Sequence, residues 1–372
     1  MSRKHLCDVL PSVAAAIGAP IPGLPARLDL PQARRAVVVL VDGLGDRLLR
    51  QRGGHAPFLR SLLDRPHCCT LEVAYPSTTA TSMGSFGTGL PPGSHGLVGL
   101  EVLDPARDVV FSELAWDPAV DPRAWQPHAT VFERLAAAGV QVAHVGPAYF
   151  DGSGLTTAAL RGARFVAADS LPERVDATLA AISRRGRAGG LVYLYWGEVD
   201  KTGHVHGCGS FEWGEELAAT DVELRRLAAR LPAGTLLVIT ADHGMVDVPF
   251  ARRIDLAVDA ELAAGVRAVG GEPRAPQLYC RPGATADVVA TWRERLGSDF
   301  RVLGRQECLE AGWFGHVDPA VLPRIGDVVA SAIGDAAVVD SRTARPATLA
   351  LLGLHGALTE DETQVPFLVH LT

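Results

Sequence analysis

The sequence predicts an α/β fold: a central, mostly parallel β-sheet flanked by helices, with a smaller inserted α+β lobe. Three observations support this prediction. Short aliphatic runs alternate with helical stretches, as in chains that build parallel sheets. Several of these runs are apolar on both faces, which is typical of strands buried within a sheet. The chain has 372 residues and is 48% hydrophobic, so it is long enough to bury a large core.

The first βα unit begins with the aliphatic run at residues 36–41, which a Leu- and Arg-rich helical stretch follows. Short bounded apolar runs are typical of buried strands, whereas apolar residues at helical spacing indicate helices. By these criteria we expect further strands at residues 140–145, 191–195, 235–240 and 366–371. We expect helices at residues 130–138, 172–183 and 211–231.

After residue 246 the alternation of predicted strands and helices becomes less regular. This region contains short predicted strands, such as residues 277–281, and a predicted helix near residues 287–296. We therefore divide the chain into three parts. Residues 1–246 form the main part of the core, residues 247–350 form an inserted lid or specificity lobe, and residues 351–372 return to the core with the final strand. The chain carries no internal repeat and no linker-like tract, so we expect the lobe to pack on the core.

Charge and composition argue against several classes of protein. The chain has 35 Lys and Arg against 42 Asp and Glu, a net charge of −7, and no cluster of basic residues, so we expect no nucleic-acid-binding surface. No apolar window approaches the roughly 20 residues of a membrane-spanning helix. The six cysteines include no CxxC pair, so we expect reduced thiols and a cytoplasmic protein. The sequence does not indicate an oligomeric state.

Acidic residues lie in predicted turns that follow three of the predicted strands: Asp42, Asp200 and Asp242. Ligands of open α/β sheets bind beyond the carboxyl ends of the strands, so these acids are expected to converge. Two of these acids have a histidine close by in the sequence: His204 follows Asp200 by four positions, and His243 follows Asp242 directly.

A further histidine, His355, precedes Gly356 and the predicted final strand. Asp and His are suitable donors for zinc, and six of them would serve two ions, although manganese or iron would suit the same donors. Taken singly, an Asp after a strand is often a helix N-cap, and a lone His is often structural. The coincidence at three strand ends favours a metal centre.

Hydroxyl side chains crowd a predicted helix start at residues 75–82. Backbone N–H groups are unpaired there and the helix dipole is positive, which suits an attacking alkoxide and an arriving phosphate. Ordinary helix capping would also explain such a cluster. The residue types alone leave four candidate nucleophiles open: Ser77, Thr78, Thr79 and Thr81.

The motifs together resemble the type I phosphodiesterase/nucleotide pyrophosphatase family of the alkaline phosphatase superfamily. They stand in the order of that family: Val-Asp42-Gly, Tyr75-Pro76-x-x-Thr79, Thr88-Gly89-Leu90-x-Pro92-x-Ser94-His95-Gly96, Asp200-x-x-Gly203-His204, Asp242-His243-Gly244-Met245 and His355-Gly356. The resemblance implies an alkaline phosphatase-like sandwich. It also implies a hydrolase with two Zn²⁺ per chain, acting on the phosphodiester or phosphoanhydride bond of a small phosphorylated substrate such as a nucleotide.

The resemblance also implies a role for each site residue. It selects Thr79 as the nucleophile, which would form a Thr-phosphoryl intermediate and contact one zinc ion. The ligands of that ion would be Asp42, Asp242 and His243. The ligands of the other ion would be Asp200, His204 and His355.

The sequence departs from the family at Leu100, where nucleotide pyrophosphatases carry an Asn that contacts the phosphoryl group. A backbone N–H at the helix start or Lys201 would be the substitute. Three alternatives stay open: a phosphomonoesterase, a phosphonoacetate-type phosphonate hydrolase on the same metals, and a metal-stabilised binding protein without catalysis. The sulfatase signature is absent. The interval between residues 95 and 200 is too short for the transfer domain of cofactor-independent phosphoglycerate mutases.

Overall fold

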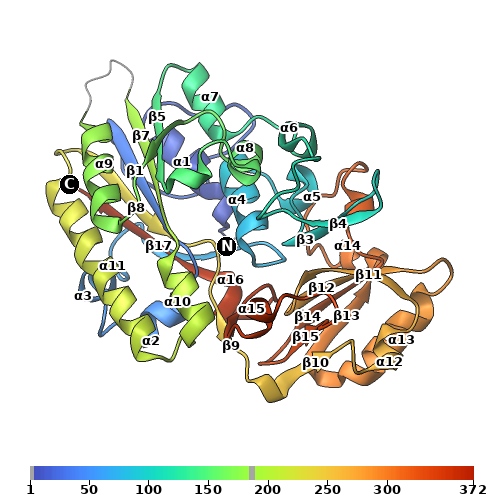
Figure 1. The fold of residues 1–372 in the computed structure, drawn as a ribbon. Coiled ribbons are helices and arrows are strands. Elements are labelled where there is room, and N and C mark those ends of the chain that lie inside the picture. The colour runs from blue at the N-terminus through green and yellow to red at the C-terminus, as the bar shows by residue number, and fades with distance from the viewer. Residues whose placement is uncertain (1–3, 184–188) are drawn as a thin grey trace.

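The computed structural model describes residues 4–183 and 189–372, and its main feature is a seven-stranded sheet (Figure 1). The strands lie in the spatial order β2 (Cys69–Glu72), β17 (Gln364–Leu371), β8 (Thr235–Thr240), β1 (Arg35–Val41), β7 (Gly190–Trp196), β5 (Gln141–Gly146) and β6 (Arg164–Ala167). The five strands from β8 to β6 are parallel. Strand β17 is antiparallel to both of its neighbours. The predicted central, mostly parallel sheet is confirmed.

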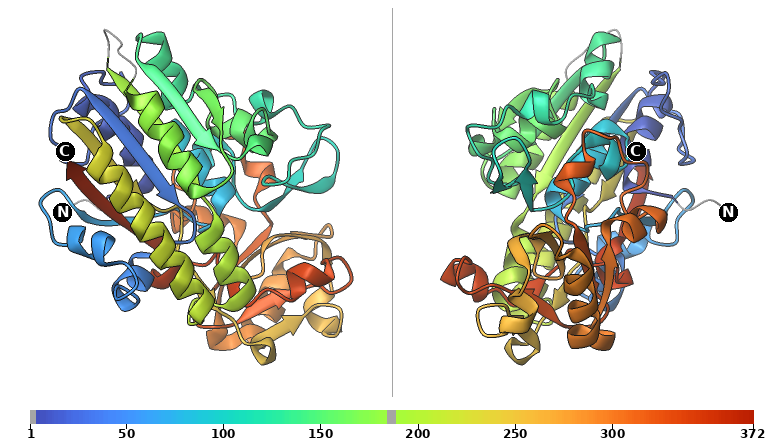
Figure 2. Two further views of the ribbon diagram at one scale, coloured as in Figure 1. Left: turned by 60° about the vertical axis from the view of Figure 1, so that its left-hand side comes forward. Right: turned by 90° about the vertical axis from the view of Figure 1, so that its right-hand side faces the viewer.

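Helices cover both faces of this sheet (Figure 2). On one face α9 (Leu171–Ile182) packs on β1, β5 and β7, and α11 (Phe211–Arg230) packs against α9. The same side holds α2 (Asp46–Gln51) and α3 (Pro57–Leu62), which contact β17. The other face carries α1 (Val9–Ala16), α4 (Thr79–Thr88), α7 (Val131–Ala137) and α8 (Gly154–Ala159).

Local sequence explains where these elements begin. Helix α9 starts with a capping box, in which the Ser170 N–H donates to the Glu173 carboxylate at 2.9 Å. Strands β1 and β8 are built from aliphatic residues that are buried on both faces, as expected for parallel strands covered by helices. The central strands could therefore be predicted from their apolar runs in the sequence.

The inserted region forms a second, antiparallel sheet in the order β11 (Val266–Glu272), β12 (Ala275–Cys280), β14 (Val328–Ala332) and β13 (Phe300–Gly304). It has its own apolar cluster around the buried Trp292 of α13 (Thr285–Leu296). The smaller pairs are β3 (Glu101–Asp104) with β4 (Val109–Ser112), β9 (Val246–Asp247) with β16 (Gly353–Leu354), and β10 (Arg253–Asp255) with β15 (Ala337–Val339).

Short helical segments complete the described chain. The α-helical ones are α5 (Pro92–His95), α6 (Pro122–Trp125), α10 (Glu198–His206), α12 (Ala260–Ala263), α14 (Arg305–Glu310), α15 (Pro346–Leu349) and α16 (Glu360–Thr363). The 3₁₀ turns are Leu6–Asp8, Ala148–Phe150, Phe250–Arg252, Gly297–Asp299 and Leu322–Arg324. Among the described residues, no helix combines the length and the apolar character that a membrane span requires.

The inserted region packs firmly on the core. Trp313 and Phe314 belong to the main apolar cluster, and their rings lie 4.6 and 5.4 Å from the ring of Tyr75. Arg274, which follows β11, forms a fully buried ion pair of 2.7 Å with Glu362 of the C-terminal segment. These contacts place the inserted region against the edge of the core where β1, β7 and β8 end. The exact division at residues 246 and 350 stays a prediction.

Candidate metal centre and nucleophile

Three acidic residues lie at the carboxyl ends of the central strands. Asp42 follows β1 directly, Asp242 follows β8 by two residues, and Asp200 lies in the first turn of α10 after β7. Because β1 pairs with both β7 and β8, the three acids meet at one edge of the sheet. The sequence predicted this convergence.

The segment that carries Asp200 differs from the sequence-based expectation. We expected a turn there, whereas the structure has helix α10, which begins at Glu198 just after Gly197. The helix places Asp200 and His204 on one face, since side chains four residues apart are neighbours. Their Oδ2 and Nε2 atoms lie 3.3 Å apart.

The six predicted ligands form two clusters. We call Asp42, Asp242 and His243 the first cluster, and Asp200, His204 and His355 the second cluster; within each cluster the potential ligand atoms lie within 4.8 Å of one another. The rings of His243 and His355 are stacked at 3.6 Å, so the clusters adjoin. All three residues of the first cluster are buried, whereas those of the second are partly exposed.

The three histidines are oriented as metal ligands would be. Each has its Nδ1 atom at hydrogen-bond distance from a backbone carbonyl: His243 from Gly244 at 2.9 Å, His204 from Gly353 at 2.6 Å, and His355 from Ser77 at 2.9 Å. Nδ1 must therefore carry the proton and donate it, which leaves the Nε2 lone pair free to bind a cation.

The carboxylates also fit a cation. Three buried oxygens, one each on Asp42, Asp200 and Asp242, have no hydrogen-bond partner among the described residues. Without a cation, burial and the neighbouring Asp42 raise the pKa of Asp242 to about 7, and the same two causes raise the pKa of Asp200. Buried acids of this kind are stable as anions only when a positive charge compensates them. The donor set therefore fits one divalent ion in each cluster.

Two further residues shape this centre: sequence reasoning missed Tyr195, and it noted Gly43 only as part of the Val-Asp42-Gly motif. Tyr195 of β7 donates its hydroxyl hydrogen bond to Asp42 Oδ2 at 2.5 Å. Gly43 adopts a positive φ of 71°, and a Cβ atom there would lie 2.8 Å from the Asp200 Cβ. Only glycine allows the chain to turn there while Asp200 approaches so closely.

Thr79 is the hydroxyl residue that faces the metal centre. It is the first residue of α4, is partly exposed, and has its Oγ1 3.2 Å from His243 Nε2. The Thr79 oxygen therefore lies beside the His243 nitrogen that would bind a cation. The other candidates are turned away or enclosed: Ser77 donates to the Ala357 carbonyl, and Thr78 and Thr81 are buried. Of the four hydroxyl candidates, Thr79 is thus the one that lies beside a predicted metal ligand.

From the sequence, either Lys201 or a backbone N–H group at the helix start was expected to take the place of the missing Asn, and the structure places these two groups differently. The Lys201 side chain is 70% exposed and pairs with Glu198 at 3.2 Å, so it is a solvated charge. Leu100, at the position of the Asn, donates its backbone N–H to Glu272 of β11 at 2.9 Å. The backbone N–H groups at the start of α4 lie beside Thr79.

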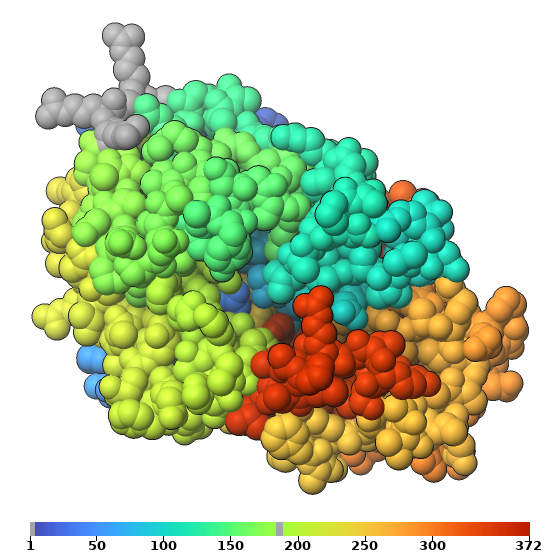
Figure 3. All heavy atoms as spheres, viewed as in Figure 1, coloured from blue at the N-terminus to red at the C-terminus, as the bar shows by residue number. Residues whose placement is uncertain are grey.

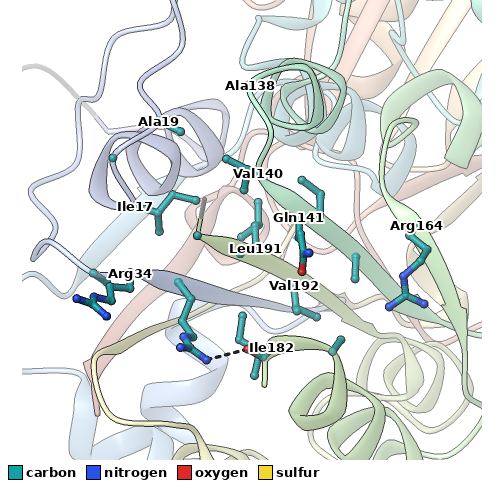
Figure 4. A pocket seen from close by; sticks show the side chains of 18 residues that line it. Ile17, Ala19, Arg34, Ala138, Val140, Gln141, Arg164, Ile182, Leu191 and Val192 are labelled. Atoms are coloured by element: carbon teal, nitrogen blue, oxygen red, sulfur yellow. Dashed lines mark hydrogen bonds between the residues drawn. The ribbon is translucent and has the colours of Figure 1, made fainter. Parts of the chain in front are cut away.

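Figure 3 shows a hollow in this face of the molecule, bordered by the segments around β3 and β4, around α10 and before β16. A separate cavity of about 1140 Å³ lies near the amino ends of β1, β5 and β7, where Arg34, Gln141 and Arg164 contribute to its wall (Figure 4). None of the residues of the two clusters lines this second cavity, so it is distinct from the metal centre.

Fold and site together define a class: α/β proteins with two adjoining clusters of potential metal ligands and a hydroxyl residue beside them at a helix start. The sequence matches the type I phosphodiesterase/nucleotide pyrophosphatase family over residues 36–358. The chain belongs to this family, and membership indicates a metal-dependent phosphoester hydrolase. No curated protein matches the sequence.

Solved structures share the fold. Murine ectonucleotide pyrophosphatase/phosphodiesterase 5 is 20% identical, with a TM-score of 0.72 over 90% of this chain and 88% of its own. An inactive Thr-to-Ala variant of the murine protein, in complex with AMP, has a TM-score of 0.70 at 20% identity over 90% of this chain and 87% of its own. Phosphonoacetate hydrolase from Sinorhizobium meliloti, in complex with phosphonoformate, is 22% identical, with a TM-score of 0.67 over 91% of this chain and 90% of its own. At these identities the likeness establishes the alkaline phosphatase-like fold.

Proposed function

We propose that this chain hydrolyses a phosphodiester or phosphoanhydride bond of a small phosphorylated substrate, with Thr79 as the nucleophile. The observation that carries the proposal is the position of the Thr79 hydroxyl, 3.2 Å from His243 Nε2 at the start of α4. The first cluster would hold one Zn²⁺ and the second cluster the other. The six cysteines are all unpaired, which fits the reducing cytoplasm that we propose as the location.

Two divalent ions would supply charge stabilisation to the attacking and departing oxygens of an in-line displacement. The residues of this chain supply the nucleophile and the hydrogen-bond donors. Thr79 Oγ1 loses its proton to solvent and forms the bond to phosphorus, while the bond from phosphorus to the leaving oxygen breaks and that oxygen takes up a proton from solvent. Water then cleaves the Thr79 phosphoester and releases the phosphoryl product. The unpaired N–H groups at the start of α4 donate hydrogen bonds to the phosphoryl oxygens.

A relative's complex supports a nucleotide as substrate, since the inactive murine Thr-to-Ala variant was solved with AMP. A phosphonate is the second candidate substrate, because the phosphonoacetate hydrolase of similar fold binds phosphonoformate and phosphonoacetate. In this chain Leu100 replaces the family Asn, which removes one polar contact from the phosphoryl site.

The test compares zinc-loaded protein on matched aryl phosphodiester and aryl phosphomonoester substrates, and on phosphonoacetate. Thr79→Ala, with its zinc content measured, controls for contaminating activity. We expect the diester to be cleaved faster than the monoester, and the activity to be lost in Thr79→Ala with both zinc ions retained. Activity that survives in Thr79→Ala contradicts the nucleophile assignment. Exclusive cleavage of phosphonoacetate would establish the second candidate, and no cleavage with two zincs bound would refute catalysis.

A further inference from the structure

Two buried serines flank Thr79, one on each side along the chain. Ser77 lies two residues before Thr79 and is fully buried, and Ser82 lies three residues after it and is 1% exposed. The hydroxyl group of each serine donates a hydrogen bond to a backbone carbonyl that is far away in the sequence. Each of these carbonyls belongs to a segment that carries predicted metal ligands of one cluster.

Ser77 is bound closely to the segment that carries His355 of the second cluster. Its hydroxyl donates to the Ala357 carbonyl at 2.8 Å and accepts from the Gly356 N–H at 3.2 Å. Its backbone N–H donates to the Gly356 carbonyl at 3.0 Å, and its own carbonyl lies 2.9 Å from His355 Nδ1. Four hydrogen bonds thus join one serine to three consecutive residues, and one of these bonds orients the ring of His355.

The same segment also fixes the other histidine of the second cluster. The Gly353 carbonyl accepts from His204 Nδ1 at 2.6 Å, and the Leu352 N–H donates to the His204 carbonyl at 2.6 Å. Residues 352–357 therefore hold both histidines of this cluster. Because Ser77 fixes one end of the segment, it supports the second cluster as a whole.

Ser82 has the corresponding place beside the first cluster. Its hydroxyl donates to the backbone carbonyl of Asp242 at 2.7 Å. Asp242 is itself a predicted ligand and precedes His243, whose Nε2 lies 3.2 Å from Thr79 Oγ1. Thr79 and Ser82 are three residues apart in α4, so their side chains share one face of the helix. That face is turned toward the segment that carries two ligands of the first cluster.

The contact made by Ser82 differs from that of an ordinary hydroxyl within a helix. Ser and Thr hydroxyls in helices commonly bond to the carbonyl four residues earlier, and Thr88 of α4 does so by donating to Gly84 at 2.7 Å. Ser82 donates instead to a residue 160 positions away, and Ser77 donates to one 280 positions away. Both hydroxyls therefore contribute to the assembly of the site.

We propose that Ser77 and Ser82 are positioning residues, each of which fixes one ligand cluster to the segment that carries Thr79. Ser77 supports the second cluster and Ser82 supports the first, so that Thr79 keeps its place relative to both. The inference rests on the proposed function for the role of Thr79 and of the two ions. It implies that loss of one serine hydroxyl weakens the binding of one ion and leaves the other ion unaffected.

The experiment titrates metal-free protein with Co²⁺ and follows the proton NMR spectrum. A histidine that binds Co²⁺ through Nε2 has an Nδ1–H signal shifted far outside the normal range, and this signal disappears in D₂O. The first cluster contains one histidine and the second contains two, so the number of shifted signals that rise together identifies the cluster that fills. Each set of signals then gives the apparent Co²⁺ affinity of its own cluster.

In Ser77→Ala the two signals of the second cluster should require about tenfold more Co²⁺, because removing a group that orients a metal ligand costs about 10- to 100-fold in affinity. The single signal of the first cluster should be unchanged. Ser82→Ala should show the reverse. Ser85→Ala is the matched control, since Ser85 is a buried serine of the same helix whose hydroxyl pairs with His95 at 3.0 Å. Both affinities should keep their wild-type values in this control.

Equal weakening of both clusters in the Ser77 and Ser82 variants, no weakening at all, or the same loss in Ser85→Ala overturns the proposal. The first and last of these results indicate a general loosening of α4, and the second indicates that the hydroxyls have no role. If an alanine variant does not fold, the cysteine variant at the same position replaces it, because a thiol is a weaker hydrogen-bonding group of similar shape.

The titration does not require turnover, so it separates this proposal from the proposed function. Wild-type protein that fills both clusters but cleaves no substrate would refute the proposed function, while the titration still decides the role of the two serines. Wild-type protein that binds no Co²⁺ would contradict both.

Discussion

Replacing His144 by Phe should remove part of the loss in the free energy of unfolding that the protein suffers as the pH falls. His144 lies in β5, is 1% exposed, and has no hydrogen-bond partner on either ring nitrogen among the described residues. Its ring packs between Phe165 and Tyr193, with both ring centroids at 4.8 Å. Burial, aided by the positive charge of Arg174, lowers the pKa of His144 to about 3.

The magnitude follows from the two pKa values. The imidazole of an unfolded chain titrates near pH 6.5, so below that pH the unfolded chain binds a proton that the folded chain does not. The free energy of unfolding therefore falls as the pH falls from about 6.5 toward about 3. At about 1.4 kcal/mol per pH unit, His144 alone accounts for a loss of about 2 kcal/mol between pH 7 and pH 5.

The assay is urea unfolding of metal-free protein at pH 7 and pH 5, followed by tryptophan fluorescence. Other titrating groups are common to both proteins, so the difference between wild type and His144→Phe isolates this residue. We expect the pH dependence of His144→Phe to be smaller by about 2 kcal/mol. His316→Gln, at a side chain that is 78% exposed, controls for the loss of a histidine as such. Identical pH dependence in wild type and His144→Phe would refute the reasoning.

Three further predictions concern the site and its support. Asp242→Ala removes a buried ligand and should abolish both zinc retention and turnover; full activity at measured metal content would contradict the ligand assignment. Tyr195→Phe removes the hydrogen bond to Asp42 and should weaken zinc binding about 10- to 100-fold, as competition with a chelator would show. Arg274→Met leaves the buried Glu362 charge unpaired and should lower the free energy of unfolding by about 3–5 kcal/mol. Adding Glu362→Leu should recover much of that loss. A further loss would contradict the explanation that the unpaired Glu362 charge causes the destabilisation.

The sequence was informative where local pattern determines structure. The aliphatic runs of β1 and β8 and the acids that follow them required only the rule that parallel strands end at the same edge. Helix α10 was missed because its residues include a glycine, Gly203, and only two apolar side chains, so that its amphipathic pattern is weak.

The residues that support the site were not predictable in the same way. Tyr195 reads as one more apolar residue of β7, and its contact with Asp42 depends on the register that pairs it with Leu40 of β1. Glu272 contacts a loop 172 residues away along the chain. Neither lies in a local motif, so only the assembled fold shows what each one touches.

The central claim is that Thr79 attacks phosphorus, and the most direct measurement is to trap the product of that attack. Zinc-loaded protein would be mixed with an aryl phosphodiester, quenched in acid within the first turnover, and digested for peptide mass spectrometry. The account predicts a mass increment on Thr79 that equals the phosphoryl group with the ester group that the substrate retains after its aryl alcohol leaves, and this increment is absent from Thr79→Ala. Turnover without any increment, or an increment on another residue, would contradict it.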